Sequence, residues 1–173
     1  MCHLPHTILT IIFDFDGVLT DDRVWVDQDG REMVSCSRRD GLAFDILHQI
    51  GINLFILSTE KNPVVAQRAQ KLGTPCIQGK KDKAAALLEL AQEKNIDLSQ
   101  ALYVGNDIND IPAMELCGRS SCPSDAHPEV QKRSTFVLRT PGGQGVAREI
   151  LEDILKINVL DEWKKINFAP QTI

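Results

Sequence analysis

The sequence predicts an α/β fold, with a mostly parallel β-sheet covered by helices on both faces. Three observations lead to this prediction. Short runs of apolar, often β-branched residues alternate with segments in which apolar residues recur at helical spacing. Polar side chains follow directly after several apolar runs, which is where parallel sheets carry their sites. A hairpin pattern interrupts the alternation once, just after the first apolar run.

Five short apolar runs account for the expected strands. The first, "ILTIIFDF", and the second, "INLFILS", are mostly apolar, as buried strands of a parallel sheet are. The insertion after the first run has "DQDG" between two short β-branched segments, and its Asp-Gly pair is a common hairpin turn. We place this hairpin insertion at about residues 21–38. The expected strands are residues 8–15, 52–58, 75–79, 101–105 and 135–139.

Five segments between these runs carry helical patterns. One is expected to begin at the N-cap Asp40 and to stop at Gly51, and the next begins with Asn62 as its cap and Pro63 in its first turn. From residue 156 onward, polar and apolar residues are mixed and predict no clear element. The expected helices are residues 40–51, 62–73, 81–95, 109–118 and 145–155.

The bulk properties indicate a single soluble domain that spans residues 1–173. The net charge of −5 and the lack of a long Lys/Arg cluster argue against a nucleic acid or an anionic membrane as a partner. No apolar run approaches the ~18 residues that span a bilayer, and the start lacks the features of a secretory signal. The five cysteines are an odd number without zinc spacing, which favours reduced thiols and a cytoplasmic location.

The end of the first expected strand raises a chemical question. Asp14 and Asp16 follow the apolar residues 11–13, and a continuing strand would point both carboxylates to the same side. Two like charges side by side repel, and burying them is costly unless a positive charge compensates. The stretch therefore indicates either a bound cation or a solvated acidic loop.

Other strand ends carry side chains that fit this chemistry. Ser58 follows the second run, Lys83 stands at a helix start after the third, and Asn106 and Asp107 follow the fourth. Carboxylate and amide oxygens from two strands suit a hard cation such as Mg²⁺. A hydroxyl and an ammonium group suit a phosphate. A carboxylate can also act as a nucleophile towards phosphorus while a second one donates a proton.

Four motifs together resemble the haloacid dehalogenase (HAD) superfamily. The stretch "DFDGVLTDD" is similar to its first motif, D-x-D-x-[TV]. Ser58 stands where the second motif has Ser or Thr, Lys83 where the third has Lys, and "GNDIND" where the fourth is acidic. The resemblance covers nearly the whole chain. It implies a Rossmann-like HAD fold in which a short hairpin after the first strand takes the place of a large cap.

Further features resemble the HAD phosphatases that act on 3-deoxy-2-keto sugar acids, both 3-deoxy-manno-octulosonate 8-phosphate and nonulosonate 9-phosphate phosphatases. These features are "DGVLTD", the hairpin, "RRDGLAF", "DAHP" and "GGQGVAREI". The resemblance implies a phosphorylated sugar acid as the small-molecule partner. It also implies a homotetramer in which the hairpins associate and a neighbouring subunit helps to close each site, and an isolated two-stranded hairpin is marginal by itself.

The resemblance implies a role for each matching residue. Asp14 would be the nucleophile that attacks phosphorus. Asp16 would protonate the sugar hydroxyl and then activate the hydrolytic water. Ser58 and Lys83 would hold the phosphoryl oxygens. Mg²⁺ would bind the Asp14 carboxylate, the main-chain carbonyl of Asp16 and a side chain of the fourth motif, and would offset the repulsion between carboxylate and phosphate.

The fourth motif departs from the pattern of the related enzymes. They usually have "GDD" where this chain has "GND", so Asn106 occupies the position of the usual metal-binding Asp. An amide oxygen can bind Mg²⁺ but brings no negative charge. Either Asn106 binds the metal more weakly, or Asp107 or Asp110 compensates. A non-catalytic or regulatory assembly module is the alternative.

The residues after Ser58 bear on the substrate. Octulosonate 8-phosphate phosphatases typically have "TGR" here, whereas this chain has "TEKN" and resembles the nonulosonate enzymes in its Glu60, Arg68 and Lys71. The two cations share one helix face and could meet the substrate carboxylate. This favours a nine-carbon acid 9-phosphate, with the eight-carbon 8-phosphate as the alternative. Thr20 and Arg39 complete the candidate substrate-binding residues.

A receiver-like signalling domain is a further alternative. Such domains also combine aspartates with Ser or Thr and Lys on a parallel sheet. Their phosphorylated Asp usually follows the third strand, whereas Asp14 follows the first. The order of the strands therefore argues against this class.

Overall fold

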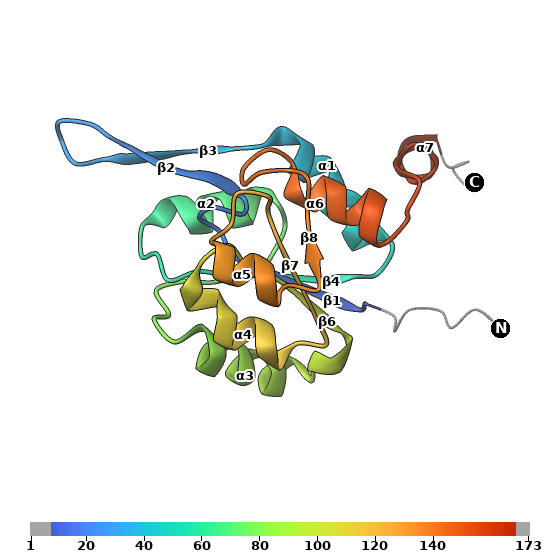
Figure 1. The fold of residues 1–173 in the computed structure, drawn as a ribbon. Coiled ribbons are helices and arrows are strands. Elements are labelled where there is room, and N and C mark those ends of the chain that lie inside the picture. The colour runs from blue at the N-terminus through green and yellow to red at the C-terminus, as the bar shows by residue number, and fades with distance from the viewer. Residues whose placement is uncertain (1–7, 169–173) are drawn as a thin grey trace.

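The computed structural model describes residues 8–168, and a six-stranded parallel sheet lies at the centre of this part of the chain (Figure 1). The strand order is β5-β4-β1-β6-β7-β8, and each neighbouring pair is parallel. The α/β fold with a mostly parallel sheet is thus confirmed. The strands are β1 (Thr10–Phe13), β4 (Asn53–Leu57), β5 (Cys76–Ile77), β6 (Ala101–Val104), β7 (Arg119–Cys122) and β8 (Phe136–Val137).

The first strand is central because it pairs on both sides. Phe13, its last residue, lies opposite Ile56 of β4 and Val104 of β6. The N–H of Asp14 continues the ladder by donating to the Val104 carbonyl at 2.8 Å. The carboxyl ends of β1, β4 and β6 therefore meet at one edge of the sheet, where sites of parallel sheets form.

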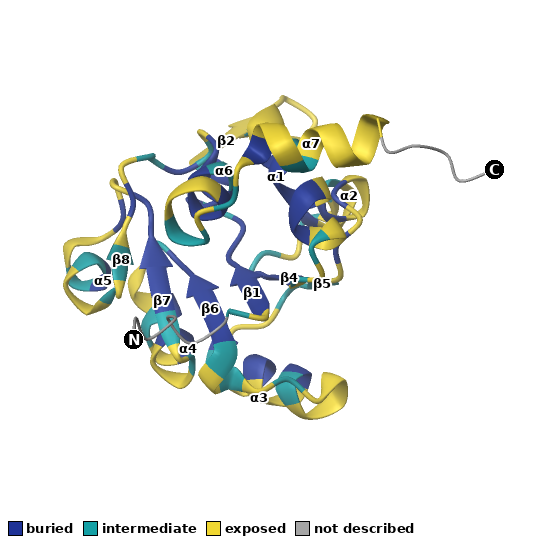
Figure 2. Cartoon of the chain, turned by 90° about the vertical axis from the view of Figure 1, so that its right-hand side faces the viewer, coloured by how far each residue is buried: buried dark blue, intermediate teal, exposed yellow. Residues whose placement is uncertain are grey.

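Helices cover both faces of the sheet, and the strand alternation divides the core between them (Figure 2). Ile11 and Phe13 face one layer, where Phe13 packs on Phe44 with ring centroids 5.0 Å apart, and Ile12 faces the other. The first layer contains α1 (Arg38–Gln49), α2 (Pro63–Lys71) and α6 (Val146–Glu149), and the second contains α3 (Lys83–Lys94), α4 (Ile111–Leu116) and α5 (Pro128–Arg133). No helix in residues 8–168 is long and apolar enough to cross a membrane.

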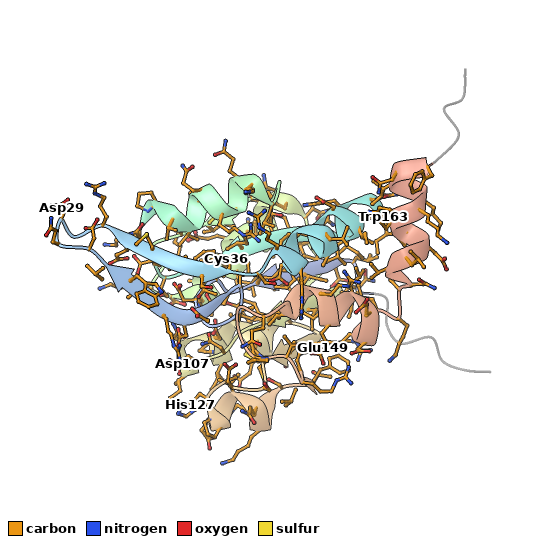
Figure 3. The ribbon with its side chains drawn as sticks, turned by 90° about the horizontal axis from the view of Figure 1, so that it is seen from above. Asp29, Cys36, Asp107, His127, Glu149 and Trp163 are labelled. Carbon is orange, nitrogen blue, oxygen red and sulfur yellow. The ribbon has the colours of Figure 1, made fainter. Side chains whose placement is uncertain are left out.

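The predicted hairpin is present as a separate two-stranded antiparallel sheet, β2 (Thr20–Val26) and β3 (Glu32–Cys36). It extends away from the rest of the fold, with Asp29 at its tip and Trp163 near the opposite end of the molecule (Figure 3). Its register shifts between Thr20 and Val24. Three large apolar side chains are exposed on β2 alone, Val24, Trp25 and Val26.

The structure corrects several predicted elements. Strand β7 was not expected because its sequence, "RSSC", is not an apolar run. Helices α5 and α7 (Val159–Phe168) were also missed. The expected helix 145–155 is α6 followed by one wider π turn at Ile150–Ile154, and the expected helix 109–118 starts as a 3₁₀ turn at Ile108–Asp110.

Asp40 is not the N-cap of α1, as was expected; Ser37 is, and its hydroxyl accepts the Arg39 N–H at 3.1 Å. Asp40 lies inside the helix and is buried. Its Oδ1 accepts the N–H of Ala147, in the first turn of α6, at 3.0 Å. Its Oδ2 is buried with no hydrogen-bond partner among the described residues. Asp40 therefore ties two helices together while holding a buried carboxylate.

We expect Asp40→Asn to remove a pH-dependent loss of stability. Burial raises the pKa of Asp40 from the ordinary 3.8 to about 6 in the folded protein. The folded state thus holds this proton more tightly than the unfolded state. The stabilisation of the fold by protonated Asp40 is therefore full below about pH 4 and is lost as the pH rises through 6. By pH 7 the loss is about 3 kcal/mol, at about 1.4 kcal/mol per pKa unit.

The measurement is the free energy of unfolding of wild type and variant from pH 4 to pH 7. The asparagine keeps an acceptor for the Ala147 N–H. The free energy of unfolding of the variant should therefore increase relative to that of wild type as the pH rises. Asp45→Asn, at an exposed position on the same helix, is the matched control and should run parallel to wild type. Parallel curves for Asp40→Asn as well would contradict the expectation.

Candidate active site

The expected site residues of three motifs meet at the carboxyl edge of the sheet. Asp14 follows β1, Ser58 follows β4, and Lys83 begins α3. All three side chains are buried in the protein, at 5%, 1% and 2% exposure. A charged group is rarely buried to this degree unless it is paired, so the pairing of Asp14 and Lys83 defines the chemistry of the site.

The Lys83 ammonium lies between two carboxylates. Its Nζ is 2.8 Å from Asp14 Oδ1 and 2.6 Å from Asp110 Oδ1. Burial alone would lower the pKa of Lys83, but the two carboxylates outweigh it and raise the pKa. Burial and Asp110 raise the pKa of Asp14 to about 8, against the opposing effect of Lys83. Two carboxyl groups thus share one ammonium group, and a second cation nearby would be electrostatically favourable.

Asp110 organises the fourth motif from within the core. Its Oδ1 accepts the hydroxyl of Tyr103 at 3.0 Å in addition to Lys83. Its Oδ2 accepts the main-chain N–H groups of Asn106 and Asp107, at 3.0 and 3.2 Å. The sequence suggested Asp110 only as a compensating ligand. In the structure it fixes both the lysine and the loop that presents Asn106.

Asn106 faces the first motif. One terminal atom of the Asn106 side-chain amide lies 2.9 Å from the Asp16 carbonyl oxygen and 3.1 Å from Asp14 Oδ2. Gly17 makes this approach possible, because a methyl group there would lie 1.9 Å from the Asn106 amide nitrogen. With the amide oxygen turned inward, three oxygens converge on one point. Such an all-oxygen set fits a hard cation such as Mg²⁺.

Asp107, the other predicted metal ligand, uses its side chain to cap the 3₁₀ turn Ile108–Asp110. It is exposed, and its Oδ1 accepts the N–H of its neighbour Ile108 at 2.7 Å. No cluster of three His, Cys, Asp or Glu side chains suited to a metal occurs within residues 8–168. The main-chain N–H of His127 donates to the Asn106 carbonyl at 2.8 Å and so supports the same loop.

Asp16, two residues after Asp14, is half-buried, and burial raises its pKa. A raised pKa suits a group that must donate a proton. The hydroxyl of Thr20 lies within the same turn: it donates to Asp16 Oδ1 at 3.4 Å and accepts the N–H of Gly17 at 3.2 Å. Thr20 therefore shapes the loop around Asp16, and its predicted contact with substrate stays a prediction.

A pair of glycines, Gly142 and Gly143, packs against this loop from outside. A methyl group at Gly142 would lie 2.2 Å from the Gly17 carbonyl oxygen, and one at Gly143 would lie 2.5 Å from the Asp21 nitrogen. The Gly143 N–H donates to the Val18 carbonyl at 3.0 Å. The sequence drew attention to "GGQG" through family resemblance, without assigning it this contact. It packs directly against the backbone that carries Asp16.

The predicted substrate-binding residues are not all brought together. Glu60 follows Ser58 and lines a cleft beside Asp16, while its Oε1 accepts the Asn62 N–H at 2.8 Å. Arg68 instead donates from Nη2 to the Ser37 carbonyl at 2.8 Å. Lys71 is exposed at the last position of α2, and Arg39 lines a different cavity, next to Gly145.

Known proteins with similar sequences support the same interpretation. The haloacid dehalogenase-like hydrolase family matches residues 66–150. The chain is 35% identical over 147 residues to the 3-deoxy-D-manno-octulosonate 8-phosphate phosphatase KdsC of Haemophilus influenzae, covering 84% of this chain and 82% of that protein.

Solved structures agree with the sequence comparison. The cobalt-bound deoxy-D-mannose-octulosonate 8-phosphate phosphatase of H. influenzae matches with a TM-score of 0.83 and 34% identity, over 87% of this chain and 89% of that one. The 3-deoxy-D-manno-octulosonate (KDO) 8-phosphate phosphatase of Moraxella catarrhalis, solved with magnesium, phosphate and KDO, matches with a TM-score of 0.82 and 33% identity over 86% of each chain.

A parallel sheet with an aspartate pair after its first strand, a serine after the next and a buried lysine defines the HAD-type phosphatases. The hairpin in place of a large cap narrows the class further. Within it, the chain belongs to the 3-deoxy-D-manno-octulosonate 8-phosphate phosphatase family.

We expect Lys83→Met to destabilise the protein strongly. The methionine would leave the carboxylates of Asp14 and Asp110 buried without their cation. Breaking a buried ion pair in this way costs about 3–5 kcal/mol. The measurement is the free energy of unfolding in denaturant, with Lys81→Met, at an exposed neighbouring position, as the control. A loss no larger than that of the control would show that Lys83 is not an essential counter-ion.

Proposed function

We propose that this protein is a Mg²⁺-dependent phosphatase that hydrolyses the phosphate ester of a 3-deoxy-2-keto sugar acid through an aspartyl-phosphate. The observation that carries the proposal is the buried Asp14–Lys83 pair with Asp16 two residues away. The pair supplies a nucleophile and a cation for phosphoryl oxygens at one place. The position of Asp14 directly after the first strand argues against the receiver-like alternative, and the phosphate-release assay described below tests the non-catalytic one.

The first half of the reaction transfers the phosphoryl group to the protein. A carboxylate oxygen of Asp14 forms a bond to phosphorus as the bond from phosphorus to the sugar oxygen breaks. Asp16, whose raised pKa favours its protonated form, gives its proton to the leaving oxygen. Lys83 and Ser58 hold the phosphoryl oxygens, with Lys83 kept in place by Asp110.

The second half returns the protein to its starting state. Asp16, now ionised, takes a proton from a water molecule as that water attacks phosphorus. The bond between phosphorus and the Asp14 oxygen breaks, and inorganic phosphate leaves. The half-buried position of Asp16, next to a cleft of about 200 Å³, gives the water access to the site.

Magnesium is the proposed cofactor. Asp14, the Asp16 carbonyl and the Asn106 amide would hold it, because the end of the amide that faces Asp16 and Asp14 can turn its oxygen towards a cation. When bound, the ion would offset the repulsion between the Asp14 carboxylate and the phosphate. The M. catarrhalis relative solved with magnesium supports this choice. Asp107 remains a proposed alternative ligand that the side-chain positions do not favour.

The eight-carbon 8-phosphate is the substrate that the relatives favour, because they are octulosonate 8-phosphate phosphatases at 33–35% identity. The nine-carbon 9-phosphate remains the second candidate, on one observation. Glu60 stands in the cleft beside Asp16, where its free oxygen can accept sugar hydroxyls. Arg68 and Lys71, the other two residues behind that idea, do not line this cleft.

We also propose a homotetramer in which the hairpins of different copies pack together. Val24, Trp25, Val26 and Met33 are 53–65% exposed on a hairpin that extends into solvent (Figure 1). Apolar side chains gathered in this way on a hairpin indicate a protein contact. The mass in solution is the direct measurement. The cytoplasmic location inferred from the cysteines stays a prediction.

We expect phosphate release to require both Mg²⁺ and Asp14. Asp14→Asn removes the nucleophile and should lower kcat by about a thousandfold or more, as removal of a covalent nucleophile does. EDTA should abolish turnover by the wild type, and added Mg²⁺ should restore it. The assay is phosphate release from the eight-carbon 8-phosphate, the nine-carbon 9-phosphate and hexose phosphates.

The substrate panel decides between the candidates. A higher kcat/KM for the eight-carbon ester supports the octulosonate assignment, and a higher value for the nine-carbon ester supports the contribution of Glu60. Folded protein that releases no phosphate from any of them in Mg²⁺ would reject the phosphatase and favour the non-catalytic module.

We expect Asn106→Asp to tighten Mg²⁺ binding. The change adds a negative charge next to Asp14 Oδ2 and the Asp16 carbonyl. The Mg²⁺ concentration for half-maximal activity should fall about tenfold, equivalent to about 1.4 kcal/mol. Without substrate, Mg²⁺ should also raise the melting temperature more in the variant than in wild type. Asn109→Asp adds the same charge at an exposed position and is the control; equal Mg²⁺ responses in both variants would exclude Asn106 as a ligand.

A further inference from the structure

The cleft beside Asp16 lies between the hairpin and the start of α2. Asp16 and Glu60 contribute to it from the sheet edge, and Asp22, Arg23 and Glu32 contribute from the hairpin. Its volume is about 200 Å³. The remaining lining residues are valines from the hairpin and from α2. The cleft therefore combines the proposed proton donor with side chains of the hairpin.

Most of the charged residues that line this cleft are acidic, whereas the proposed substrate is itself an acid. Four of the lining residues are carboxylates, and they would repel the carboxylate that a sugar acid carries. Arg23 is the one cation among the lining residues within 8–168. It makes no ion pair or side-chain hydrogen bond with any described residue, although carboxylates line the same cleft. Its guanidinium is therefore available to a ligand.

The wall that carries Arg23 is held in place by the backbone and by a contact to α2. Asp22, directly before Arg23, has a left-handed backbone (φ 61°), and the hairpin register shifts at this point. On the facing strand, Glu32 Oε2 accepts the side-chain N–H of Asn62 at 2.9 Å. Asn62 is also the N-cap of α2. The hairpin is thereby connected to the helix on the other side of the cleft.

We propose that Arg23 binds the carboxylate of the substrate and so selects sugar acids over neutral sugar phosphates. This proposal rests on the proposed function, and it names the residue that recognises the acid. In a 2-keto acid phosphorylated on its last carbon, carboxylate and phosphate lie at opposite ends. Asp14 and Lys83 are at the buried end of the site, and exposed Arg23 is on the hairpin at the outer end. A planar guanidinium matches a carboxylate with two parallel hydrogen bonds.

Arg68 and Lys71 were expected to perform this task, but their positions do not favour it within one subunit. The guanidinium of Arg68 donates to the Ser37 carbonyl, and its Nε is buried without a partner among the described residues. Lys71 lies at the far end of α2 from Asn62. Neither lines the cleft.

The test compares Arg23→Gln with wild type on two pairs of ligands. For turnover, the pair is the eight-carbon acid 8-phosphate and its C1 methyl ester, which lacks the charge. We expect KM for the acid to rise about tenfold to a hundredfold, the range for losing a charge-assisted hydrogen bond, with kcat nearly unchanged. KM for the methyl ester should not change. Arg23→Lys keeps the charge without the planar fork and should fall in between.

Arg31→Gln is the matched control, because it removes the same charge from the same hairpin at an exposed site outside the cleft, where Arg31 pairs with Asp27 and Asp29. An unchanged KM for the acid in Arg23→Gln, or an equal rise for the methyl ester, would overturn the proposal. So would an equal effect of Arg31→Gln.

A calorimetric titration separates this proposal from the proposed function. The free eight-carbon acid and its methyl ester are titrated into wild type and Arg23→Gln, with no turnover required. Selective loss of affinity for the free acid supports Arg23 even if phosphate release fails, in which case the proposed reaction alone is rejected. Equal affinity in both proteins, or no binding by wild type, overturns the role of Arg23.

Discussion

The site depends on one buried ammonium group shared by two carboxylates. Lys83 is 2.8 Å from Asp14 and 2.6 Å from Asp110, and each carboxylate would be costly to bury without it. Asp110 in turn accepts the Asn106 and Asp107 N–H groups. The Lys83–Asp110 pair therefore holds both Asp14, the proposed nucleophile, and the loop that carries Asn106, a proposed metal ligand. Because two carboxylates share one ammonium, a further cation next to Asp14 would stabilise the ionised form of that carboxyl.

The sheet supplies the geometry for this arrangement. Parallel pairing of β1 with β4 and β6 brings Asp14, Ser58 and Asn106 to one edge from three separate stretches of sequence. Two close contacts at glycines complete the site geometry. The Asn106 amide packs directly against Gly17, and the Gly17 carbonyl packs directly against Gly142. Larger side chains at these two positions would collide with their neighbours. The shape of the candidate site thus depends on these small residues as well as on the proposed catalytic side chains beside them.

Much of the fold and the central site could be predicted from sequence because their signals are local. Apolar runs mark buried strands, and the aspartates and Ser58 follow directly after them. Strand β7, with two serines, lacks that signal, and its place in the sheet is decided by pairing with β6 and β8. Asp40 looked like a cap for its own helix, but its partner Ala147 lies 107 residues away. The place of Arg23 in the cleft depends likewise on how the hairpin lies against α2.

The contact of the "GGQG" loop with the backbone after Asp16 has a consequence for how the protein matures. Asp14 leaves the ribosome well before Gly142 and Gly143, which lie more than a hundred residues further along the chain. Their packing on Gly17 and Asp21 completes the shape of the loop that carries Asp16. A nascent chain that has folded only its first strands therefore has both proposed catalytic carboxylates of the first motif, but lacks the packing that shapes the loop around Asp16. The loop therefore reaches its final shape only after the "GGQG" segment has been synthesised and has packed against it.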